Sequence, residues 1–251
     1  MKSALLGWAA LFVGLAAVSS GDAVAARVVH AEGFLASHAA DGTQSLCTKA
    51  RRLGYVPKQD VCSDALTTDI DGDGRRDLVL LYAHPITGTG ASLKAYPETL
   101  KVVRAEGETI QARLRPTTPA PGIVAVANVN GRPGDEVFVA TNWTSSGPQV
   151  LVYSLLAGRL IGSGATLNFG GDSANRFGFS CVQKPAPAII QHDYSLTGPN
   201  IYGRWRLTTY TYAWSGATLQ LIGRATTIHH GWPGRSAIRP GGGCGPRPEY
   251  R

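Results

Sequence analysis

An acidic, glycine-containing segment that leads directly into an apolar run places the strongest constraint on the fold of this 251-residue chain. The segment is DIDGDGRRD, residues 69–77, with aspartates at its first, third, fifth and ninth positions, and LVLLY follows it. Glycine tolerates the backbone angles that let alternate side chains of such a loop converge on one point. Converging carboxylates repel one another unless a cation lies between them. Because Ca²⁺ accepts about six to eight oxygen ligands in irregular geometry, the segment predicts a calcium site.

The predicted ligands are four carboxylates and one backbone carbonyl oxygen. The carbonyl is that of Arg75, at the seventh position of the loop, and the carboxylates are those of Asp69, Asp71, Asp73 and Asp77. Water would complete the coordination. Mg²⁺ suits the loop less well, because it requires a near-octahedral site and retains its own waters. The alternative is an acidic turn that holds no metal.

The residues after the loop distinguish between the families of calcium loop that begin with Asp-x-Asp-x-Asp-Gly. EF-hand and dockerin-type loops carry an acid at the twelfth position and lead into a helix. Here the twelfth position is Leu80, inside a short apolar run that is typical of a buried strand. The segment resembles the FG-GAP/VCBS repeat of integrin-α-like β-propellers, in which Asp-x-Asp-x-Asp-Gly-x-x-Asp precedes an apolar strand. The resemblance implies a structural calcium ion and a blade-like sheet.

A second, altered copy of the segment follows at an offset of 59 residues. NVNGRPGDE, residues 128–136, stands where DIDGDGRRD stands in the first copy, and VFVAT stands where LVLLY stands. Asparagines replace the first two aspartates, and Arg132 replaces the third. We expect this copy to hold no metal, because a guanidinium would oppose a bound ion. In this hypothesis Arg132 is an internal cation paired with Glu136 or Asp135.

Two strand–glycine turn–strand patterns recur at the same spacing, QVLVYSLLAGRLIG at residues 149–162 and LTTYTYAWSGATLQLIG at residues 207–223. Three aromatic residues of the second pattern alternate with smaller ones, which places them on one face of a strand: Tyr210, Tyr212 and Trp214. We interpret this face as core packing between sheets, and a sugar-stacking platform is the alternative.

These repeats predict an all-β fold with about three blade-like antiparallel units, arranged as a propeller or part of one. The third loop should begin near Pro187, where no acidic ladder remains. A closed ring, an open stack of blades and a sandwich are all compatible with three units. The predicted organisation is a signal segment at 1–25, an N-terminal segment with a short helix at 26–66, the repeat domain at 67–224 and a Gly/Pro-rich tail at 225–251.

The first 25 residues have the features of a secretory signal. Lys2 precedes an apolar run that is too short to span a bilayer securely, and an Ala-x-Ala pattern ends at Ala25. We expect a secreted chain, extracellular or periplasmic, with no membrane span after cleavage. A membrane anchor is the alternative.

The four cysteines predict two disulfide bonds, as an even number does in an exported protein. Three pairings are open. We favour Cys47–Cys62, which is local, and Cys181–Cys244, which would attach the C-terminal tail. A zinc site is not expected, because no Cys-x-x-Cys spacing is present.

Composition and motifs limit the functions that the chain could have. The net charge of +7 suits an anionic partner such as a cell-wall polymer or an acidic glycan, although an ordinary solvated basic surface is the alternative. No dense basic block with interleaved aromatics is present, so we expect no specific nucleic-acid partner. No Gly-x-Ser-x-Gly or His-Glu-x-x-His motif is present either. His192 and Asp193 are adjacent in a strand pattern and therefore point to opposite faces.

The sequence therefore favours a calcium-stabilised extracellular binding module without catalytic residues. Its partner would be an extracellular protein, a glycan or a cell-wall polymer. The alternative is a secreted hydrolase built on a β-propeller scaffold, and an inhibitor or immunity-type protein is also compatible.

Overall fold

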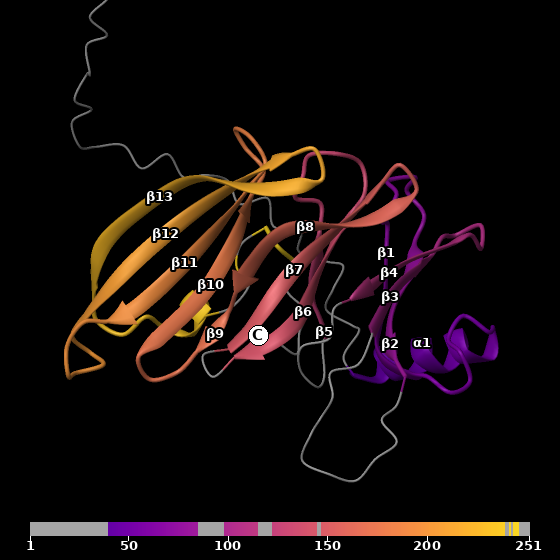
Figure 1. Cartoon of the computed structure of the whole chain (residues 1–251), viewed down its shortest axis with the longest axis horizontal. Helices are drawn as coiled ribbons and strands as arrows, with labels where there is room; N and C mark the ends of the chain where they lie inside the picture. The colour runs from indigo at the N-terminus through magenta and orange to yellow at the C-terminus, as the bar shows by residue number, and fades with distance from the viewer. Residues whose placement is uncertain are drawn as a thin grey trace, which may run out of the picture. The chain divides into compact units, whose positions relative to one another are not determined.

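The computed structural model describes residues 40–84, 98–114, 122–144, 147–238, 241 and 243–245. The predicted signal segment, residues 1–25, lies outside these residues. Within them the chain forms three antiparallel sheets, one α-helix and one short 3-10 helix, η1 (Arg235–Ile238) (Figure 1). None of the described sheets closes into a barrel. The predicted all-β fold class is confirmed.

Every sheet follows chain order, so neighbouring strands are antiparallel and joined directly. Sheet A consists of β1 (Val61–Thr68), β2 (Asp77–Ala83), β3 (Glu98–Val103) and β4 (Thr109–Leu114). Sheet B consists of β5 (Gly122–Ala127), β6 (Glu136–Thr144), β7 (Gly147–Leu156) and β8 (Arg159–Asn168). Sheet C consists of β9 (Gly170–Gly171), β10 (Asn175–Val182), β11 (Ala188–Leu196), β12 (Arg204–Ser215) and β13 (Thr218–His230). These sheets are the three blade-like units that the repeats predict.

The α-helix, α1 (Ala40–Arg52), lies beside sheet A (Figure 1). Its last turn is rich in basic residues, which interact favourably with the negative end of the helix dipole. Gly54 follows with a φ of 77°, a left-handed conformation suited to a helix C-terminus. The sequence predicts a short helix between Cys47 and Cys62. In the structure the helix begins before Cys47, and the disulfide bond joins it to β1.

β2 is apolar on both faces because both faces of sheet A are covered. Val79 and Leu81 point one way and pack in a cluster with residues of sheet B. Leu80 and Tyr82 point the other way and pack in a cluster with Ala50 of α1. This two-sided burial explains why the run LVLLY shows no alternation of apolar and polar residues.

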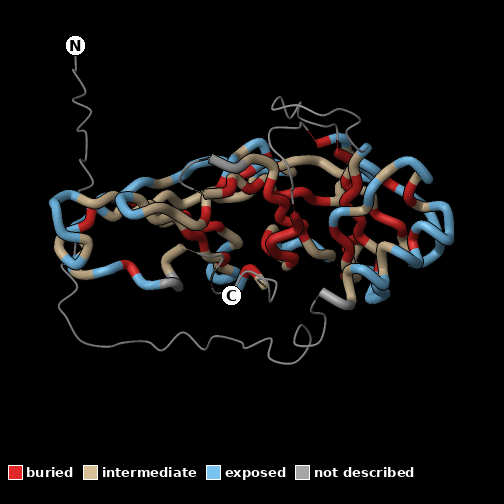
Figure 2. The backbone as a smooth tube through the Cα atoms, turned by 90° about the horizontal axis from the view of Figure 1, so that it is seen from below, coloured by how far each residue is buried: buried red, intermediate tan, exposed pale blue. Residues whose placement is uncertain are grey.

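Sheet B is the middle layer of the stack. In β6, Val137 and Val139 pack toward sheet A, whereas Phe138 and Ala140 pack toward sheet C. The ring of Phe138 stacks on that of Phe179 in β10, with centroids 5.6 Å apart. Buried residues follow the strands of sheets A and B, whereas β13 is exposed along most of its length (Figure 2). Sheet B therefore has an apolar layer on each of its faces, in addition to the cluster between sheet A and α1.

The two acidic or amide-rich loops occupy equivalent positions in sheets A and B. Asp77 opens β2 and pairs with Thr68, and Glu136 opens β6 and pairs with Ala127. The offset of 59 residues thus reflects a true structural repeat. In sheet C the corresponding loop joins β10 to β11 and consists of residues 183–187. The sequence predicts that this third loop begins near Pro187, whereas in the structure it ends there.

Both predicted disulfide bonds are confirmed, Cys47–Cys62 and Cys181–Cys244. The second bond links β10 to the tail, and Cys244 is fully buried in the core between sheets B and C. Two cystines are typical of proteins from an oxidising compartment, extracellular or periplasmic. In the described part of the chain, no helix has the length and apolar character needed to cross a membrane.

The two predicted hairpins are present as β7–β8 and β12–β13. Tyr212 and Trp214 of β12 pack against the core between sheets B and C, as expected for an inner face. β13 continues to His230. The predicted boundary between the repeat domain and the tail, at residue 224, therefore falls within this strand.

Glu98, at the start of β3, is a buried acid with 9% of its surface exposed. Burial raises the pKa of Glu98 from 4.5 to about 7. The folded protein therefore binds this proton more tightly than the unfolded chain, so the contribution of Glu98 to the free energy of unfolding falls as pH rises from about 4.5 to 7. We expect Glu98→Gln to gain stability relative to the parent protein across this interval. Urea denaturation at several pH values measures the difference, and a constant difference would contradict the prediction.

Candidate metal-binding site

Three of the predicted carboxylate ligands converge in the loop between β1 and β2. Asp69, Asp71 and Asp77 each offer one carboxylate oxygen, and these atoms all lie within 4.8 Å of one another. The donors are all carboxylate oxygens, which is the chemistry that hard divalent cations such as Ca²⁺ prefer. The residues present therefore fit a calcium ion, and the same atoms also fit other hard cations.

Backbone N–H groups of the loop hold two of these carboxylates in place. Asp69 accepts hydrogen bonds from Gly72 at 2.7 Å and from Gly74 at 2.9 Å. Gly72 and Gly74 have φ angles of 77° and 82°, which only glycine adopts readily. The loop can therefore curl around the Asp69 side chain.

Asp77 is the fully buried member of the cluster. Its two oxygens accept hydrogen bonds from the backbone N–H groups of Ile70, at 2.9 Å, and Ala105, at 3.0 Å. Burial raises the pKa of Asp77, and these hydrogen bonds oppose the increase. Asp77 thus ties the loop to the β3–β4 turn, and a nearby cation would favour its ionised form.

Asp73 lies outside the three-carboxylate cluster. Its carboxylate accepts hydrogen bonds from the backbone N–H, Nε and Nη2 of Arg75, at 2.7, 2.8 and 2.6 Å. The hydrogen bond from the backbone of Arg75, followed by that from its side chain, lowers the pKa of Asp73. The roles of Asp73 and of the Arg75 carbonyl oxygen as ligands stay predictions.

Arg104, in the β3–β4 turn, supplies positive charge to the same loop. It donates from Nε to Asp71 at 2.6 Å and also pairs with Glu106 and Glu108, at 3.1 and 2.5 Å. Hydrogen bonds to Glu108 and then Asp71 raise the pKa of Arg104. One cluster carboxylate is therefore already paired with a cation of the protein.

Sequence reasoning did not identify Arg104 as part of the site. The sequence feature that could have indicated it is the run RAEGE at residues 104–108, a glycine-containing turn with three charged residues. Only the pairing of β3 with β2 brings this turn beside the acidic loop.

The second loop is held by amide groups in place of a guanidinium. The Nδ2 of Asn130 donates to Oε1 of Glu136 at 2.5 Å, and the backbone N–H groups of Val129 and Asn130 donate to Oε2 at 2.8 and 3.2 Å. Arg132 is exposed, and the structure pairs its side chain with neither Glu136 nor Asp135. The proposed internal cation is therefore wrong, because the Asn130 amide satisfies the buried acid. Burial raises the pKa of Glu136 to about 7.

The first and second loops pack directly against each other. The backbone N–H of Asp135 donates to the carbonyl oxygen of Asp69 at 2.7 Å, and the hydroxyl of Thr68 donates to the Asp135 carboxylate. A Cβ atom on Gly134 would lie 2.2 Å from the carbonyl oxygen of Ile70. The second loop therefore supports the backbone that carries Asp69.

His192 and Asp193, the other candidates for acid–base chemistry, do not form a dyad. They are consecutive in β11 and pair with different partners across the sheet. Asp193 accepts a hydrogen bond from Gln191 at 2.7 Å. Burial lowers the pKa of His192 and raises that of Asp193.

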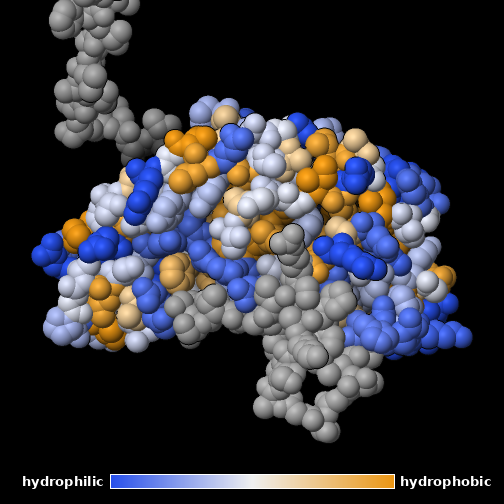
Figure 3. Space-filling view, in the orientation of Figure 1, coloured by the Kyte–Doolittle hydropathy of each residue, from blue (hydrophilic) through white to orange (hydrophobic). Residues whose placement is uncertain are grey.

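On the face shown in Figure 3, hydrophilic residues are interspersed with small apolar areas. Several apolar side chains are nevertheless more than half exposed, including Leu221, Ile222 and Tyr202. Two of these belong to β13 and the third to the β11–β12 turn.

No known protein family matches the sequence, and no curated protein is similar to it. Among solved structures, the chain is similar to the exotype rhamnogalacturonan lyase YesX, with 14% identity over 66% of this chain and 33% of that one and a TM-score of 0.38. It is similar to the Bacillus licheniformis rhamnogalacturonan lyase PL11, with 13% identity over 66% and 34% of the two chains and a TM-score of 0.37. A Xanthomonas type IV secretion system related protein has 12% identity over 67% of this chain and 95% of its own, with a TM-score of 0.28.

The chain thus spans about a third of the length of the two lyases. TM-scores below 0.5 do not define a shared fold, so no property of these proteins is assigned to this chain.

Proposed function

We propose that the protein is an exported, calcium-stabilised β-repeat protein of the FG-GAP/VCBS type that binds an extracellular partner. The convergence of Asp69, Asp71 and Asp77 at the start of a buried strand is the observation that carries this proposal. The two cystines and the apolar N-terminal segment of the sequence support export. Three carboxylate oxygens within 4.8 Å of one another suit the binding of a cation.

The role of the ion would be structural. Asp69 and Asp71 belong to the loop, and Asp77 belongs to β2, so an ion held by all three would connect the loop to sheet A. The second loop packs on the same backbone, so the ion would also strengthen the junction between sheets A and B. Its binding free energy adds to the stability of the fold because the unfolded chain lacks the site.

Calcium is expected to raise the melting temperature of the protein. With a dissociation constant of about 10⁻⁴ M, about 1 mM calcium would stabilise the fold by roughly 1.4 kcal/mol, which corresponds to about 3–6 °C for a chain of this size. Melting curves with increasing calcium and with EDTA measure this shift. An equal shift with magnesium would assign the site to divalent cations in general.

Substitutions test which carboxylates bind the ion. Asp69→Asn should abolish the calcium-dependent shift, because it removes a charged member of the cluster. Asp73→Asn is the matched control, since Asp73 lies in the same loop but bonds to Arg75. Loss of the shift in both variants would instead support the full set of predicted ligands, and a wild-type protein without any shift would contradict calcium binding.

Arg104→Gln tests whether the arginine competes with a metal. Removing the guanidinium leaves Asp71 without its cation, so calcium should bind more tightly by about tenfold, in line with one charge-assisted hydrogen bond. Calorimetric titration measures the change. Weaker binding in this variant would show that Arg104 supports the loop geometry that the ion requires.

A further inference from the structure

β12 and β13 extend beyond the part of sheet C that packs against sheet B. Near the β12–β13 turn, Tyr212 and Trp214 join the core on the inner face of the sheet. Toward the start of β12 the same face carries Arg206 and Arg204, both exposed. The inner face of sheet C therefore ends in exposed arginines, beyond the part that packs against sheet B.

The partners across β13 continue this polar face. Arg204 pairs with His230, Arg206 with Ile228, Thr208 with Thr226 and Tyr210 with Arg224, and directly paired residues share a face. The guanidinium of Arg224 lies 5.4 Å from the centroid of the Tyr210 ring. We call this surface the basic face of β12–β13.

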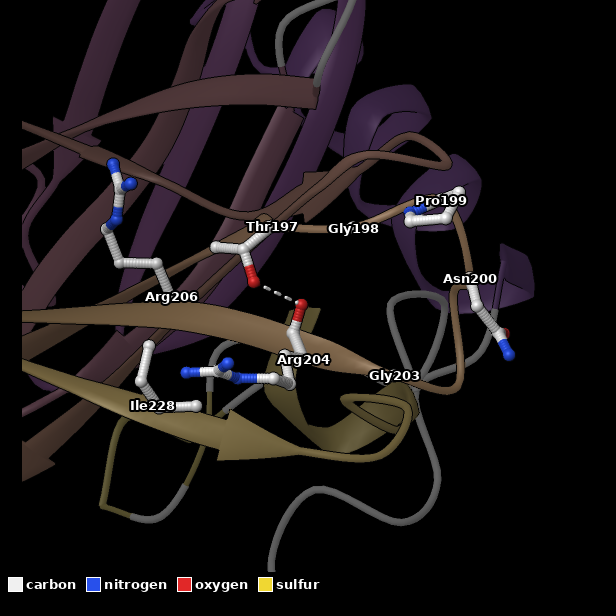
Figure 4. Close-up of a pocket in the computed structure, with 8 residues that line it drawn as sticks. All are labelled: Thr197, Gly198, Pro199, Asn200, Gly203, Arg204, Arg206 and Ile228. Carbon is white, nitrogen blue, oxygen red and sulfur yellow. Dashed lines mark hydrogen bonds between the residues drawn. The ribbon is translucent and has the colours of Figure 1, made fainter.

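A pocket of about 400 Å³ lies at the end of this face, beside the β11–β12 turn (Figure 4). Its walls include Arg204, Arg206, Ile228 and Thr197. Figure 4 shows the Arg204 side chain turned toward Ile228, while Asn200 at the tip of the turn points away. The pocket therefore offers cationic groups beside an apolar surface.

The turn that forms the pocket is held by its own hydrogen bonds. The hydroxyl of Thr197 donates to the carbonyl oxygen of Arg204 at 2.8 Å. The backbone N–H of Gly203 donates to the carbonyl oxygen of Asn200 at 2.9 Å. These hydrogen bonds therefore fix the backbone beneath the arginines.

None of the ion pairs between described residues involves Arg204, Arg206 or Arg224. The acidic residue nearest to them in the strand pairing is Asp193, opposite Thr208, and its carboxylate accepts a hydrogen bond from Gln191. In the described structure these three arginines therefore form no ion pair with Asp193 or with another acid.

We propose that the pocket and the basic face of β12–β13 bind an acidic glycan through its carboxylates. Guanidinium groups form paired hydrogen bonds with planar carboxylates, and Ile228 provides an apolar contact for a sugar ring. Single-stranded nucleic acid fits less well, because it needs aromatic rings for base stacking and none of the residues that line the pocket is aromatic. This proposal rests on the proposed binding function and names its ligand class, but it does not depend on the calcium loop.

The test is binding of a short oligogalacturonate to the full chain by calorimetry. The fully methyl-esterified oligosaccharide is the ligand control, because it has the same sugars without the charges. Arg204→Ala and Arg206→Ala should each weaken binding about tenfold, whereas Arg159→Ala, at the exposed first residue of β8, should have no effect. Arg206→Lys should also weaken binding, because lysine keeps the charge and loses the paired geometry.

Three outcomes would overturn the proposal: equal binding of the esterified ligand, equal binding of single-stranded DNA of similar charge, or no binding at all. The calcium-dependent melting shift is measured on the same preparations. If the shift is retained and oligogalacturonate does not bind, the ligand class is wrong while the calcium-stabilised fold stands. If the glycan binds without any calcium shift, the calcium site is wrong and the glycan site stands.

Discussion

Removal of the Cys181–Cys244 bond is expected to lower the free energy of unfolding by about 4 kcal/mol. The two cysteines are separated by 63 residues, and closing a loop of that length removes more chain entropy from the unfolded state than closing a short one. The Cys47–Cys62 loop, with a separation of 15 residues, gives about 3 kcal/mol in the same treatment.

The location of the bond increases the expected effect. Cys244 is fully buried, and the core that contains it joins sheets B and C. Cutting the bond therefore releases a tail that fills part of this core, in addition to relaxing the unfolded chain. The double variant Cys181→Ala/Cys244→Ala, denatured in urea beside Cys47→Ala/Cys62→Ala, measures the difference. A larger loss of unfolding free energy in Cys47→Ala/Cys62→Ala would show that the attachment of α1 contributes more to stability than the attachment of the tail.

The local features of the fold could be predicted from the sequence because short-range patterns determine them. The apolar runs LVLLY and VFVAT predict strands at residues 78–82 and 137–141, and β2 and β6 begin one residue earlier, at Asp77 and Glu136. The glycine turns of β7–β8 and β12–β13 are equally local. The positions of the four cysteines in the sequence, together with the expected oxidising compartment, were sufficient to favour the correct disulfide pairing.

Contacts between distant segments account for what could not be predicted. The sequence pattern gives no sign that Arg104 pairs with Asp71, because the β3–β4 turn reaches the acidic loop only when β3 pairs with β2. The bond between Asp73 and Arg75 is local, but Arg75 also donates to Glu106 of the same β3–β4 turn. The alternation of Tyr210, Tyr212 and Trp214 shows that they share a face of β12. It does not show that this face is no longer covered by sheet B at Arg206. A periodic pattern indicates which side of a strand a residue occupies and does not indicate how far the covering sheet extends.

The second loop is a further example, since Arg132 in its fifth position predicts a turn without metal but does not predict that the turn supports the first loop. Two glycines make this contact close. A Cβ on Gly72 would lie 2.3 Å from the Cβ of Pro133, and one on Gly134 would lie 2.2 Å from the oxygen of Ile70. The two loops therefore behave as one unit, and a change in the second should be felt at the carboxylates of the first.

Gly134→Ala is expected to destabilise the protein by about 3 kcal/mol or more, the sum of left-handed backbone strain and steric overlap. Gly158→Ala is the matched control. Gly158 also has a positive φ, 72° against 98° for Gly134, but a Cβ there would meet no atom within 4 Å. We expect the control to cost about 1–2 kcal/mol from strain alone.

The same pair of variants tests the coupling of the loops. Because the N–H of Asp135 bonds to the carbonyl oxygen of Asp69, displacing residue 134 should move a predicted ligand and reduce the calcium-dependent melting shift. Gly158→Ala leaves both loops untouched and should keep the shift. Urea denaturation gives the stability difference, and melting with and without calcium gives the coupling. Equal costs for the two variants would mean that the loops separate easily, and the junction between sheets A and B would then depend on the apolar core alone.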